Sequence, residues 1–449
     1  MSKRLVVCCD GTWNKPDQIK KGLPVPTNVP KLARAVAPSD RQGREQRMFY
    51  QPGVGTKRWE RFRGGAFGAK LGRNVLDAYR FVVQNYEPGD EIFFFGFSRG
   101  AFTARSTAGL IRNSGILRPE HADLTGQAYA LYRDRDPHRN HPDSLEAELF
   151  RRSYSYPKEL ADKPVRFIGV WDTVGTLGIP LSGLRLINWF NRRWQFHDAQ
   201  LSSEVGAAFQ ALAIDEKRGP FQPSVWKQSK KAEGQRLEQV WFAGVHKDVG
   251  GGYSDSTLAE IALLWMVDRA KKFGLAFEPD AFAGLPSGCE CAVLQRYTGA
   301  YVAPGPFVDL HNSSTGIYPL LAGIYRLSTV LKMSKMKMFE GLDGERTPGK
   351  PDKRQEPGST DKRNEYVAST VVGRKEHRPD YRPTNILTNA DNTLEEKLVP
   401  TQASTGAAGT KPERPHWLTG PCPSTCPWNR AAHGSGMAGS GMVGSVGAG

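Results

Sequence analysis

The chain has 449 residues, and 61 lysines and arginines against 46 aspartates and glutamates give it a formal net charge of +15. Hydrophobic residues make up 39% and aromatic residues 10%, which is enough for a sizeable core and excludes a wholly disordered chain. The 48 glycines and 31 prolines exceed the usual share of roughly 12% and predict many loops, but the absence of a G-X-Y period excludes a collagen. No window approaches the ~20 apolar residues of a membrane-spanning helix, and the apolar run that follows Lys3 and Arg4 is too short for a signal peptide. We therefore expect a cytoplasmic protein, or one exported without a cleaved leader.

Six cysteines are too few for a disulfide scaffold in a chain of this length. Cys289 with Cys291 and Cys422 with Cys426 could together supply four zinc ligands, but the first pair has one intervening residue and the second lies in a proline-rich stretch. None of the nine histidines falls in an H-x-x-x-H pattern. We interpret the cysteines as unpaired thiols and expect neither a metal nor a cofactor.

Strand and helix patterns alternate along the chain up to residue 273. Apolar runs predict strands at residues 4–9, 47–50, 91–97, 165–171 and 237–245. Helical spacing predicts helices at residues 28–37, 75–86, 101–112, 203–214 and 257–273, and the glycine-rich, cationic stretch 53–72 is predicted to be a loop. This alternation predicts an α/β fold with a mostly parallel sheet flanked by helices.

The remaining part of the chain changes composition. Residues 335–365 are charged and rich in lysine, glycine and proline, which is typical of an exposed insertion. Beyond residue 390 the chain is low in complexity and cannot bury enough apolar surface to offset its ordering entropy. We expect one domain over residues 1–390 and a disordered tail over residues 391–449.

Residues 96–100 form a G-x-S-x-G pattern between a predicted strand and a predicted helix. In α/β-hydrolases this strand–turn–helix presents a serine hydroxyl above the sheet edge, so we predict that Ser98 is a nucleophile and that the sheet is α/β-hydrolase-like. Gly96 and Gly100 would relieve crowding where the backbone packs closely. The alternative is a Gly/Ser turn without a catalytic partner.

A serine nucleophile needs a base and an acid that orients the base, and hydrolases of this fold carry them in the order Ser, Asp, His. Asp172 and His246 follow two later strands, where catalytic groups collect at the carboxyl ends. Asp172 could instead cap a helix or form an Asx-turn, and His246 could be a structural histidine. His311 is the rival base, and Asp248 is either the rival acid or a residue that shapes the turn before three glycines.

An oxyanion hole requires two backbone N–H donors. We expect one from Arg99, the residue after the nucleophile, and the other from the turn Gly11-Thr12, which Asp10 could brace. The alternative for this turn is a purely structural Asx-turn. A phosphate loop at Gly53 is disfavoured because the Walker spacing is absent.

Cations alternate with aromatic residues in the predicted loop near residue 60. The members are Arg58, Trp59, Arg61, Phe62, Arg63, Phe67, Lys70 and Arg73. This stretch could lie on an anionic membrane surface, guide a phosphorylated substrate, bind nucleic acid or be an ordinary solvated loop. We expect no nucleic acid partner, and the sequence does not specify an oligomeric state.

Six blocks carry a resemblance to a known family: LVVCCDGTWN (5–14), PGVGT (52–56), GFSRGAFTAR (96–105), GVWDTVG (169–175), ALAIDEKR (211–218) and WFAGVHKDVGGGY (241–253). They resemble the catalytic domain of type VI secretion phospholipase effectors and its uncharacterised soluble relatives. The resemblance implies an α/β-hydrolase with a Ser-Asp-His triad that acts on ester bonds, in the effectors those of phospholipids. The resemblance favours Ser98 as the nucleophile and His246 as the base. It does not decide between Asp172 and Asp248 as the acid.

These observations predict a serine hydrolase that cleaves carboxylic ester bonds, of lipids or phospholipids, through the triad Ser98, Asp172 and His246 and an acyl-enzyme. An acyltransferase with the same triad is the first alternative. The second is a non-catalytic module that keeps the fold and binds lipid or nucleic acid through its basic surface.

Overall fold

The computed structural model describes residues 2–11, 14–20, 23–53, 64–134, 136, 141–158, 163–174, 200–218, 221, 223–228, 232, 234–279, 281–284, 301–302, 308–311, 313, 365–368, 371, 374, 377–378, 381 and 398–399. Several predictions fall outside these residues: Thr12, the cationic stretch at 54–63, nearly all of the charged insertion and the four cysteines of the zinc alternative. The predicted tail also lies outside them, except for Leu398–Val399, which forms a short strand at the sheet edge.

Eight strands form one sheet in the order β14-β13-β10-β8-β6-β5-β1-β4, and every neighbouring pair is parallel. The strands are β1 (Arg4–Cys9), β4 (Gln46–Gln51), β5 (Glu91–Phe97), β6 (Val165–Trp171), β8 (Val205–Ala213), β10 (Arg236–Phe242), β13 (Glu365–Ala368) and β14 (Leu398–Val399). Three small two-stranded pairs join β2 (Ile19–Lys20) to β3 (Leu23–Pro24), β7 (Gln200–Leu201) to β9 (Lys227–Gln228) and β11 (Ala283–Gly284) to β12 (Tyr301–Val302). The predicted parallel α/β sheet is confirmed.

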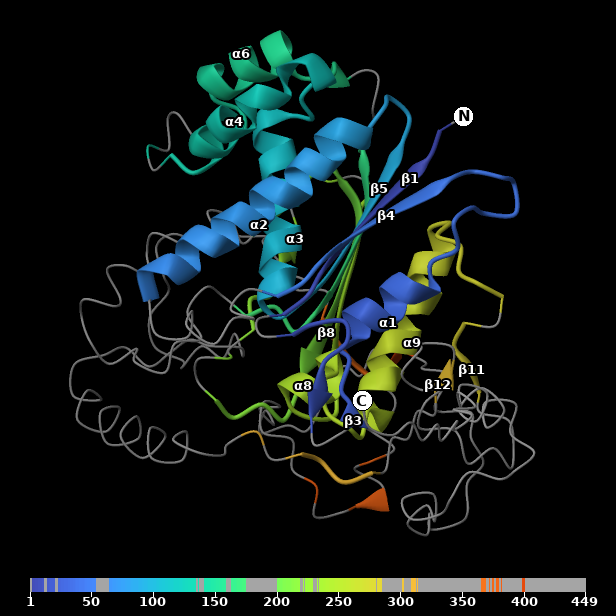
Figure 1. Ribbon diagram of the computed structural model, residues 1–449. Coiled ribbons are helices and arrows are strands. Elements are labelled where there is room, and N and C mark those ends of the chain that lie inside the picture. The colour runs from blue at the N-terminus through green and yellow to red at the C-terminus, as the bar shows by residue number, and fades with distance from the viewer. Residues whose placement is uncertain are drawn as a thin grey trace, which may run out of the picture.

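Helices cover both faces of this sheet (Figure 1). The described helices are α1 (Asn28–Ala35), α2 (Gly64–Asn85), α3 (Arg99–Ser114), the 3₁₀ helix η2 (Pro119–Leu124), α4 (Thr125–Tyr132), α6 (Leu145–Tyr154), α8 (His246–Gly250) and α9 (Thr257–Lys272). Of these, η2, α4 and α6 pack on α2 and α3 instead of on the sheet. None of these described helices is long and apolar enough to cross a membrane.

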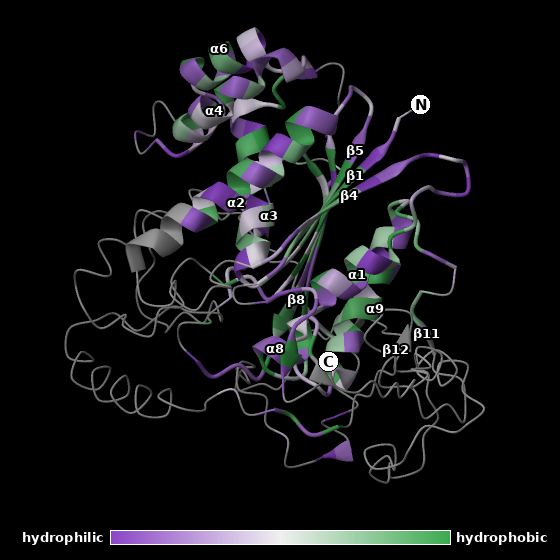
Figure 2. Ribbon diagram, viewed as in Figure 1, coloured by the Kyte–Doolittle hydropathy of each residue, from purple (hydrophilic) through white to green (hydrophobic). Residues whose placement is uncertain are grey.

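The core consists of two hydrophobic layers, one on each face of the sheet. Alternate residues of β1 divide between them: Leu5 and Val7 pack with α2 and α3, whereas Val6 and Cys8 pack with α1 and α9. This division follows from the two-residue period of a strand. Figure 2 shows the hydrophobic colour in the middle of the strands and along α9, while the amino ends of β1, β4 and β5 are hydrophilic.

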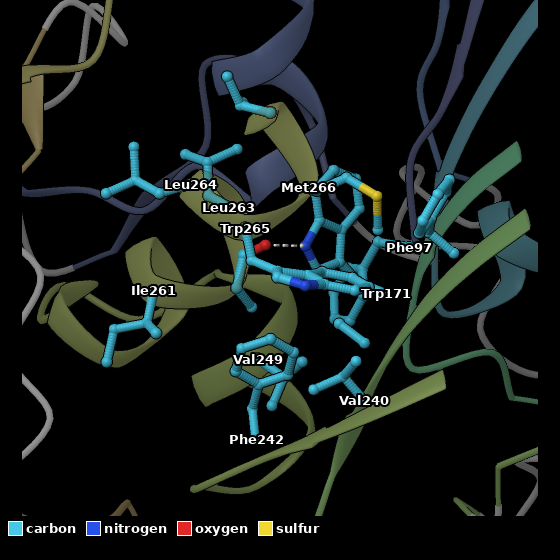
Figure 3. Packing of buried hydrophobic residues seen from close by; sticks show 14 of the residues in the cluster. Phe97, Trp171, Val240, Phe242, Val249, Ile261, Leu263, Leu264, Trp265 and Met266 are labelled. Carbon is cyan, nitrogen blue, oxygen red and sulfur yellow. Dashed lines mark hydrogen bonds between the residues drawn. The ribbon is translucent and has the colours of Figure 1, made fainter. Parts of the chain in front are cut away.

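Trp171, the last residue of β6, is fixed in the layer that faces α9. Its indole N–H donates to the Ala262 carbonyl at 3.3 Å, and its ring lies among buried residues that include Phe97 and Met266 (Figure 3). This packing fixes the position of the last residue of β6, and therefore that of Asp172, which follows it.

Two predictions of secondary structure are wrong. Residues 203–214, predicted to be helical, form strand β8, which lies between β6 and β10 and is buried along nearly its whole length. Ladder hydrogen bonds on both sides and helices on both faces outweigh the helix propensity of its alanines. Helix α2 begins at Gly64, inside the predicted loop 53–72, because packing against α3 and the sheet can extend a helix beyond its local preference.

The strand order changes direction between β1 and β5. The chain leaves β1 for β4 on one side, through α1, and then returns to β5 on the other side of β1, through α2. Ligand sites of open α/β sheets lie at the carboxyl ends of strands at such a switch point. Asp10 follows β1 and Ser98 follows β5, so both lie at this position.

Candidate active site

Ser98 occupies a sharp turn between β5 and α3, as the G-x-S-x-G pattern predicts. Its backbone has φ 57° and ψ −118°, a region that costs a non-glycine residue of order 1–3 kcal/mol. A Cβ atom at Gly96 would lie 2.6 Å from the Gly100 carbonyl oxygen, and one at Gly100 would lie 2.1 Å from the carbonyl oxygen of the last residue of β1. Only glycines fit these two positions. The absence of a side chain at Gly100 allows the turn to pack directly against the end of β1.

Asp172 and His246 are hydrogen-bonded through Nδ1 of the imidazole and Oδ2 of the carboxylate at 2.5 Å. Both residues are buried, with 1% and 4% of their surface exposed, so water does not compete for this contact. The other carboxylate oxygen of Asp172 accepts the Ala213 N–H at 3.1 Å. A carboxylate that is held at both oxygens fixes the orientation of the imidazole.

The strand order makes this contact possible. Asp172 follows β6, His246 begins α8 four residues after the last residue of β10, and β8 lies between these two strands. Strands β6 and β10 are therefore two strand spacings apart, about 10 Å, and either Asp172 or His246 must extend across β8 for the two side chains to meet. Asp172 does so: its φ is 40°, and its N–H donates to the Ala211 carbonyl of β8 at 2.7 Å.

Two aromatic rings enclose His246. The ring centroid of Phe97, the residue before Ser98, lies 4.6 Å from that of the imidazole, and that of Phe221 lies 4.9 Å from it. A Cβ atom at Gly250 would lie 1.9 Å from the Phe97 ring, so α8 is packed directly against the serine turn. His246 is thereby placed beside the turn that carries Ser98.

The rival residues form a second His–Asp pair. His311 Nδ1 and Asp248 Oδ1 are 2.6 Å apart, and the Tyr253 ring stacks on the His311 imidazole with centroids 4.0 Å apart. Asp248 also accepts the Val245 N–H at 3.1 Å, which is the turn-shaping role considered as an alternative. The hydrogen bond that His311 donates to Asp248 raises the pKa of His311 despite the opposing effect of burial. The structure thus pairs Asp172 with His246 and Asp248 with His311.

The sequence model of the type VI secretion (T6SS) phospholipase effector family, Tle1-like, catalytic domain, matches residues 3–269, more than half of the chain. The chain belongs to this family. The matched residues contain Ser98, Asp172 and His246, whereas His311 lies beyond them. Membership agrees with the coarse prediction of a lipid-ester hydrolase.

Individual relatives are more distant. The uncharacterized protein YEL023C of Saccharomyces cerevisiae is 29% identical over 239 residues, which cover 49% of this chain and 32% of the yeast protein. The chain therefore matches about a third of the length of this curated relative. An uncharacterized protein from Pseudomonas aeruginosa aligns with a TM-score of 0.38 at 16% identity, over 62% of this chain and 46% of that chain. The structure described as RedJ with a PEG molecule bound in the active site aligns with a TM-score of 0.27 at 16% identity, over 58% and 91% of the two chains.

Sequence reasoning missed Glu216 as a residue of this candidate site. Its carboxylate accepts the His246 backbone N–H at 3.2 Å, two 2.8 Å bonds from the Arg218 guanidinium and the Ser313 hydroxyl at 3.0 Å. Burial is the largest single influence on the pKa of Glu216 and raises it, but the hydrogen bonds and charge of Arg218, together with the His246 N–H, outweigh burial and lower the pKa. Its place just after β8, within the ALAIDEKR block, was the signal that could have identified it.

The first strand ends in the turn predicted to complete the oxyanion hole. Asp10 is buried and accepts the Gly11 N–H at 2.7 Å, the Thr27 hydroxyl at 2.8 Å and the Tyr50 hydroxyl at 2.8 Å. Burial, only partly offset by these bonds, raises the pKa of Asp10 to about 6. Since the Gly11 N–H is directed at Asp10, Thr12 is the candidate donor in this turn, and it lies outside the described residues. Arg99 is the first residue of α3, where helical N–H groups have no acceptor within the helix.

In the part of the chain that the structure covers, no three histidine, cysteine or acidic side chains gather as metal ligands. Cys8 and Cys9 are buried free thiols in β1, and burial raises both pKa values, so they are poor thiolate ligands.

Proposed function

We propose that the protein is a serine hydrolase that cleaves carboxylic ester bonds of lipids, with Ser98 as nucleophile, His246 as base and Asp172 as orienting acid. The observation that carries this proposal is the 2.5 Å contact between Asp172 and His246 beside the strained turn of Ser98. Because an ionised carboxylate can only accept, Nδ1 of His246 carries the proton and Nε2 is left as the basic nitrogen.

In the first half-reaction, His246 Nε2 takes the proton from Ser98 Oγ while Oγ attacks the ester carbonyl carbon. The negative charge on the carbonyl oxygen is stabilised by the Arg99 N–H, by the positive end of α3 and by a second donor from the turn after β1. The imidazolium then protonates the leaving alcohol as the C–O bond breaks. The acyl group remains esterified to Ser98.

In the second half-reaction, His246 removes a proton from water, and the resulting hydroxide equivalent attacks the acyl-enzyme. The imidazolium returns its proton to Ser98 Oγ as the carboxylic acid leaves. Asp172 stays ionised throughout and stabilises the imidazolium at each stage. Burial of both partners strengthens this electrostatic contribution, since little water screens it.

The test is covalent labelling of the full-length chain with a fluorophosphonate probe, read by intact mass, together with hydrolysis of a p-nitrophenyl ester series. Ser98→Ala should abolish both the mass shift and turnover. Ser106→Ala is the matched control because Ser106 is a buried serine on the same helix, α3, and should change neither. Turnover that survives Ser98→Ala would refute the triad.

The alternatives predict other results from the same preparation. An acyltransferase would move the acyl group to an added alcohol faster than to water. A non-catalytic module would leave Ser98 unlabelled and bind anionic liposomes or DNA in a salt-sensitive manner.

A further inference from the structure

Three successive backbone N–H groups lead from β10 into α8 and end at His246. Each of them donates to a different carboxylate: Gly244 to Asp215 Oδ2 at 2.7 Å, Val245 to Asp248 Oδ2 at 3.1 Å and His246 to Glu216 Oε2 at 3.2 Å. The N–H groups at the start of a helix have no acceptor four residues before them, so side-chain oxygens commonly satisfy them. The three carboxylates therefore fix the course of the backbone that carries the proposed base.

Each of these carboxylates also accepts a side-chain donor from the C-terminal part of the chain. The three pairs are Tyr381 Oη with Asp215 Oδ2 at 2.8 Å, Ser313 Oγ with Glu216 Oε1 at 3.0 Å and His311 Nδ1 with Asp248 Oδ1 at 2.6 Å. All three donors lie beyond residues 3–269, which the family model matches. The backbone at His246 is thus tied, through one carboxylate at each step, to residues outside the matched domain.

Burial makes these contacts difficult for water to replace. Each of the three carboxylate residues is at most 7% exposed, and Ser313 and Tyr381 are each 9% exposed. Burial and the negative charge of Asp215 raise the pKa of Tyr381, so its hydroxyl keeps its proton and remains a donor. A buried carboxylate that loses a donor either moves toward its remaining donors or bears the cost of a lost hydrogen bond, ~1–3 kcal/mol. A movement of the carboxylate also moves the backbone N–H group that it holds.

A buried arginine joins the two C-terminal segments that supply these donors. The Arg374 guanidinium donates to the Val308 carbonyl at 2.6 Å and lies over the Tyr381 ring, 5.4 Å from its centroid. Arg374 is almost completely buried, and Val308 lies three residues before His311. The three donors therefore belong to one connected support and not to separate loops.

We infer that Tyr381, Ser313 and His311 are positioning residues for His246. This inference rests on the proposed serine hydrolase function. The triad acid and two aromatic rings hold the imidazole itself, whereas these three residues act through carboxylates on the backbone beneath it. Proton transfer from Ser98 requires Nε2 of the base at hydrogen-bond distance from Oγ, so a small displacement of this backbone lowers the rate of catalysis.

The second His–Asp pair thereby receives a role outside proton transfer. Asp248 accepts the Val245 N–H at the start of α8 and is itself held by the backbone N–H and the imidazole of His311. His311→Leu should lower kcat about tenfold, whereas His311→Asn, whose amide can donate to the same carboxylate, should retain most of it. A loss of about 10³-fold for His311→Leu would indicate proton transfer by His311 and would overturn its positioning role.

The first experiment removes single hydroxyl groups from the full-length chain. Tyr381→Phe and Ser313→Ala each delete one donor and leave the rest of the side chain in place. For a short-chain p-nitrophenyl ester, each should lower kcat per folded molecule about tenfold, equivalent to ~1.4 kcal/mol, with KM unchanged within about twofold. Ser313→Thr restores a hydroxyl and should keep kcat within about threefold of the wild type. An unchanged kcat in both deletion variants would overturn the inference.

Two matched controls delete the same group from the same type of residue elsewhere. Tyr79→Phe removes a hydroxyl that donates to the Gly115 carbonyl at 2.8 Å, at the end of α3 remote from Ser98. Ser256→Ala removes a buried hydroxyl that donates to the Glu260 carboxylate at 2.6 Å. Both controls should lower Tm without changing kcat. An equal loss of kcat in the test and control variants would reflect a general loss of stability and would overturn the inference.

A double-mutant cycle tests whether Tyr381 acts through Asp215. Asp215→Asn keeps the shape of the side chain but removes its charge and one of its acceptor oxygens. In this background, Tyr381→Phe should lower kcat by less than about threefold, because the contact that it removes is already weakened. A further loss of about tenfold would show that the two residues act independently, and would overturn the route through the carboxylate.

The second experiment does not depend on turnover. The proton between His246 Nδ1 and Asp172 Oδ2, which lie 2.5 Å apart, is followed as a low-field proton NMR resonance and assigned by its absence from His246→Gln. Both hydroxyl deletions near the site should shift this resonance, and both controls should leave it unchanged. A resonance that is the same in all four variants would overturn the inference. If the wild-type chain hydrolyses no ester, the esterase proposal fails, while the resonance still decides whether the C-terminal residues position His246.

Discussion

Replacement of Asp172 by asparagine tests whether the contact between Asp172 and His246 is needed for catalysis. Each oxygen of Asp172 accepts one bond: Oδ2 from the His246 imidazole at 2.5 Å and Oδ1 from the Ala213 N–H at 3.1 Å. Asparagine has nearly the same shape but only one acceptor oxygen. One of the two donors must therefore face an NH₂ group in a site that water does not reach.

The two orientations of the amide have different consequences. If its oxygen keeps the Ala213 bond, its NH₂ group faces Nδ1 of His246, the proton moves to Nε2, and the imidazole can no longer accept the proton of Ser98. If its oxygen keeps the His246 bond, the NH₂ group opposes the Ala213 N–H, at a cost of ~2 kcal/mol. In either case the carboxylate charge beside the developing imidazolium is lost, which adds ~2–4 kcal/mol at an effective dielectric constant of about 20. At ~1.4 kcal/mol per factor of ten, kcat should fall about 10³- to 10⁴-fold.

The assay is the initial rate of hydrolysis of a short-chain p-nitrophenyl ester, normalised to folded protein by thermal unfolding. Asp77→Asn is the matched control, since Asp77 lies on α2 and forms an exposed ion pair with Arg80 at 3.2 Å. Its rate should equal that of the wild type. Asp248→Asn is measured alongside because it removes the acid of the second pair.

The refuting result is equally specific. A loss below tenfold for Asp172→Asn, together with a 10³-fold loss for Asp248→Asn, would mean that the His311 pair performs the proton transfer. The pairing seen between Asp172 and His246 would then be structural, and the proposed triad would be wrong.

Three further predictions concern stability. Gly100→Ala should destabilise the fold by about 3 kcal/mol or more in urea unfolding and abolish probe labelling, because its methyl group would lie 2.1 Å from a carbonyl oxygen of β1; a fully labelled, stable variant would contradict the packing. Lys31→Met should cost ~3–5 kcal/mol because it removes the ammonium group that lies 2.9 Å from the buried Glu260 carboxylate, and Lys31→Met with Glu260→Leu should recover most of the loss; a single variant as stable as the wild type would contradict this. The raised folded-state pKa of His311 means that its pair with Asp248 stabilises the fold fully below the unfolded-state pKa of ~6.5 and loses this contribution as the pH rises through the folded-state value. His311→Gln should therefore lower Tm more at pH 5.5 than at pH 9, and a deficit independent of pH would show that the imidazolium does not contribute.

Much of the sheet could be predicted locally. Strands β1, β5 and β6 are short apolar runs between turn residues, which is the local signature of a strand buried on both faces. The turn at Ser98 was also a local property, because a strand, two glycines and a helix in immediate succession leave the backbone few other conformations. The conformation of these segments depends on residues that are close in the sequence, so it can be predicted from the sequence alone.

Strand β8 and the choice of partners depended on tertiary structure. The run at Val205–Ala213 has helix-forming alanines, and only its place between β6 and β10 makes it a strand. The sequence offered two acids and two histidines as candidates, of which only Asp172 and His246 follow predicted strands, and left their pairing open. Asp172 meets His246, 74 residues away, because it leans across β8, and Asp248 meets His311 because the turn of α8 directs it there. Glu216 follows β8, which lies between the strands that carry Asp172 and His246, so strand order also brings Glu216 to the site.

The amino-acid sequence by itself determined the parallel α/β class, the serine turn and the set of residues that can perform acid–base chemistry. The tertiary structure decided which of these residues touch, and it brought Tyr381, Ser313 and His311 to the carboxylates that hold the backbone at His246. Periodicity and turn chemistry act over a few residues, whereas contacts across a sheet depend on strand order, and strand order is set by the packing of the whole domain.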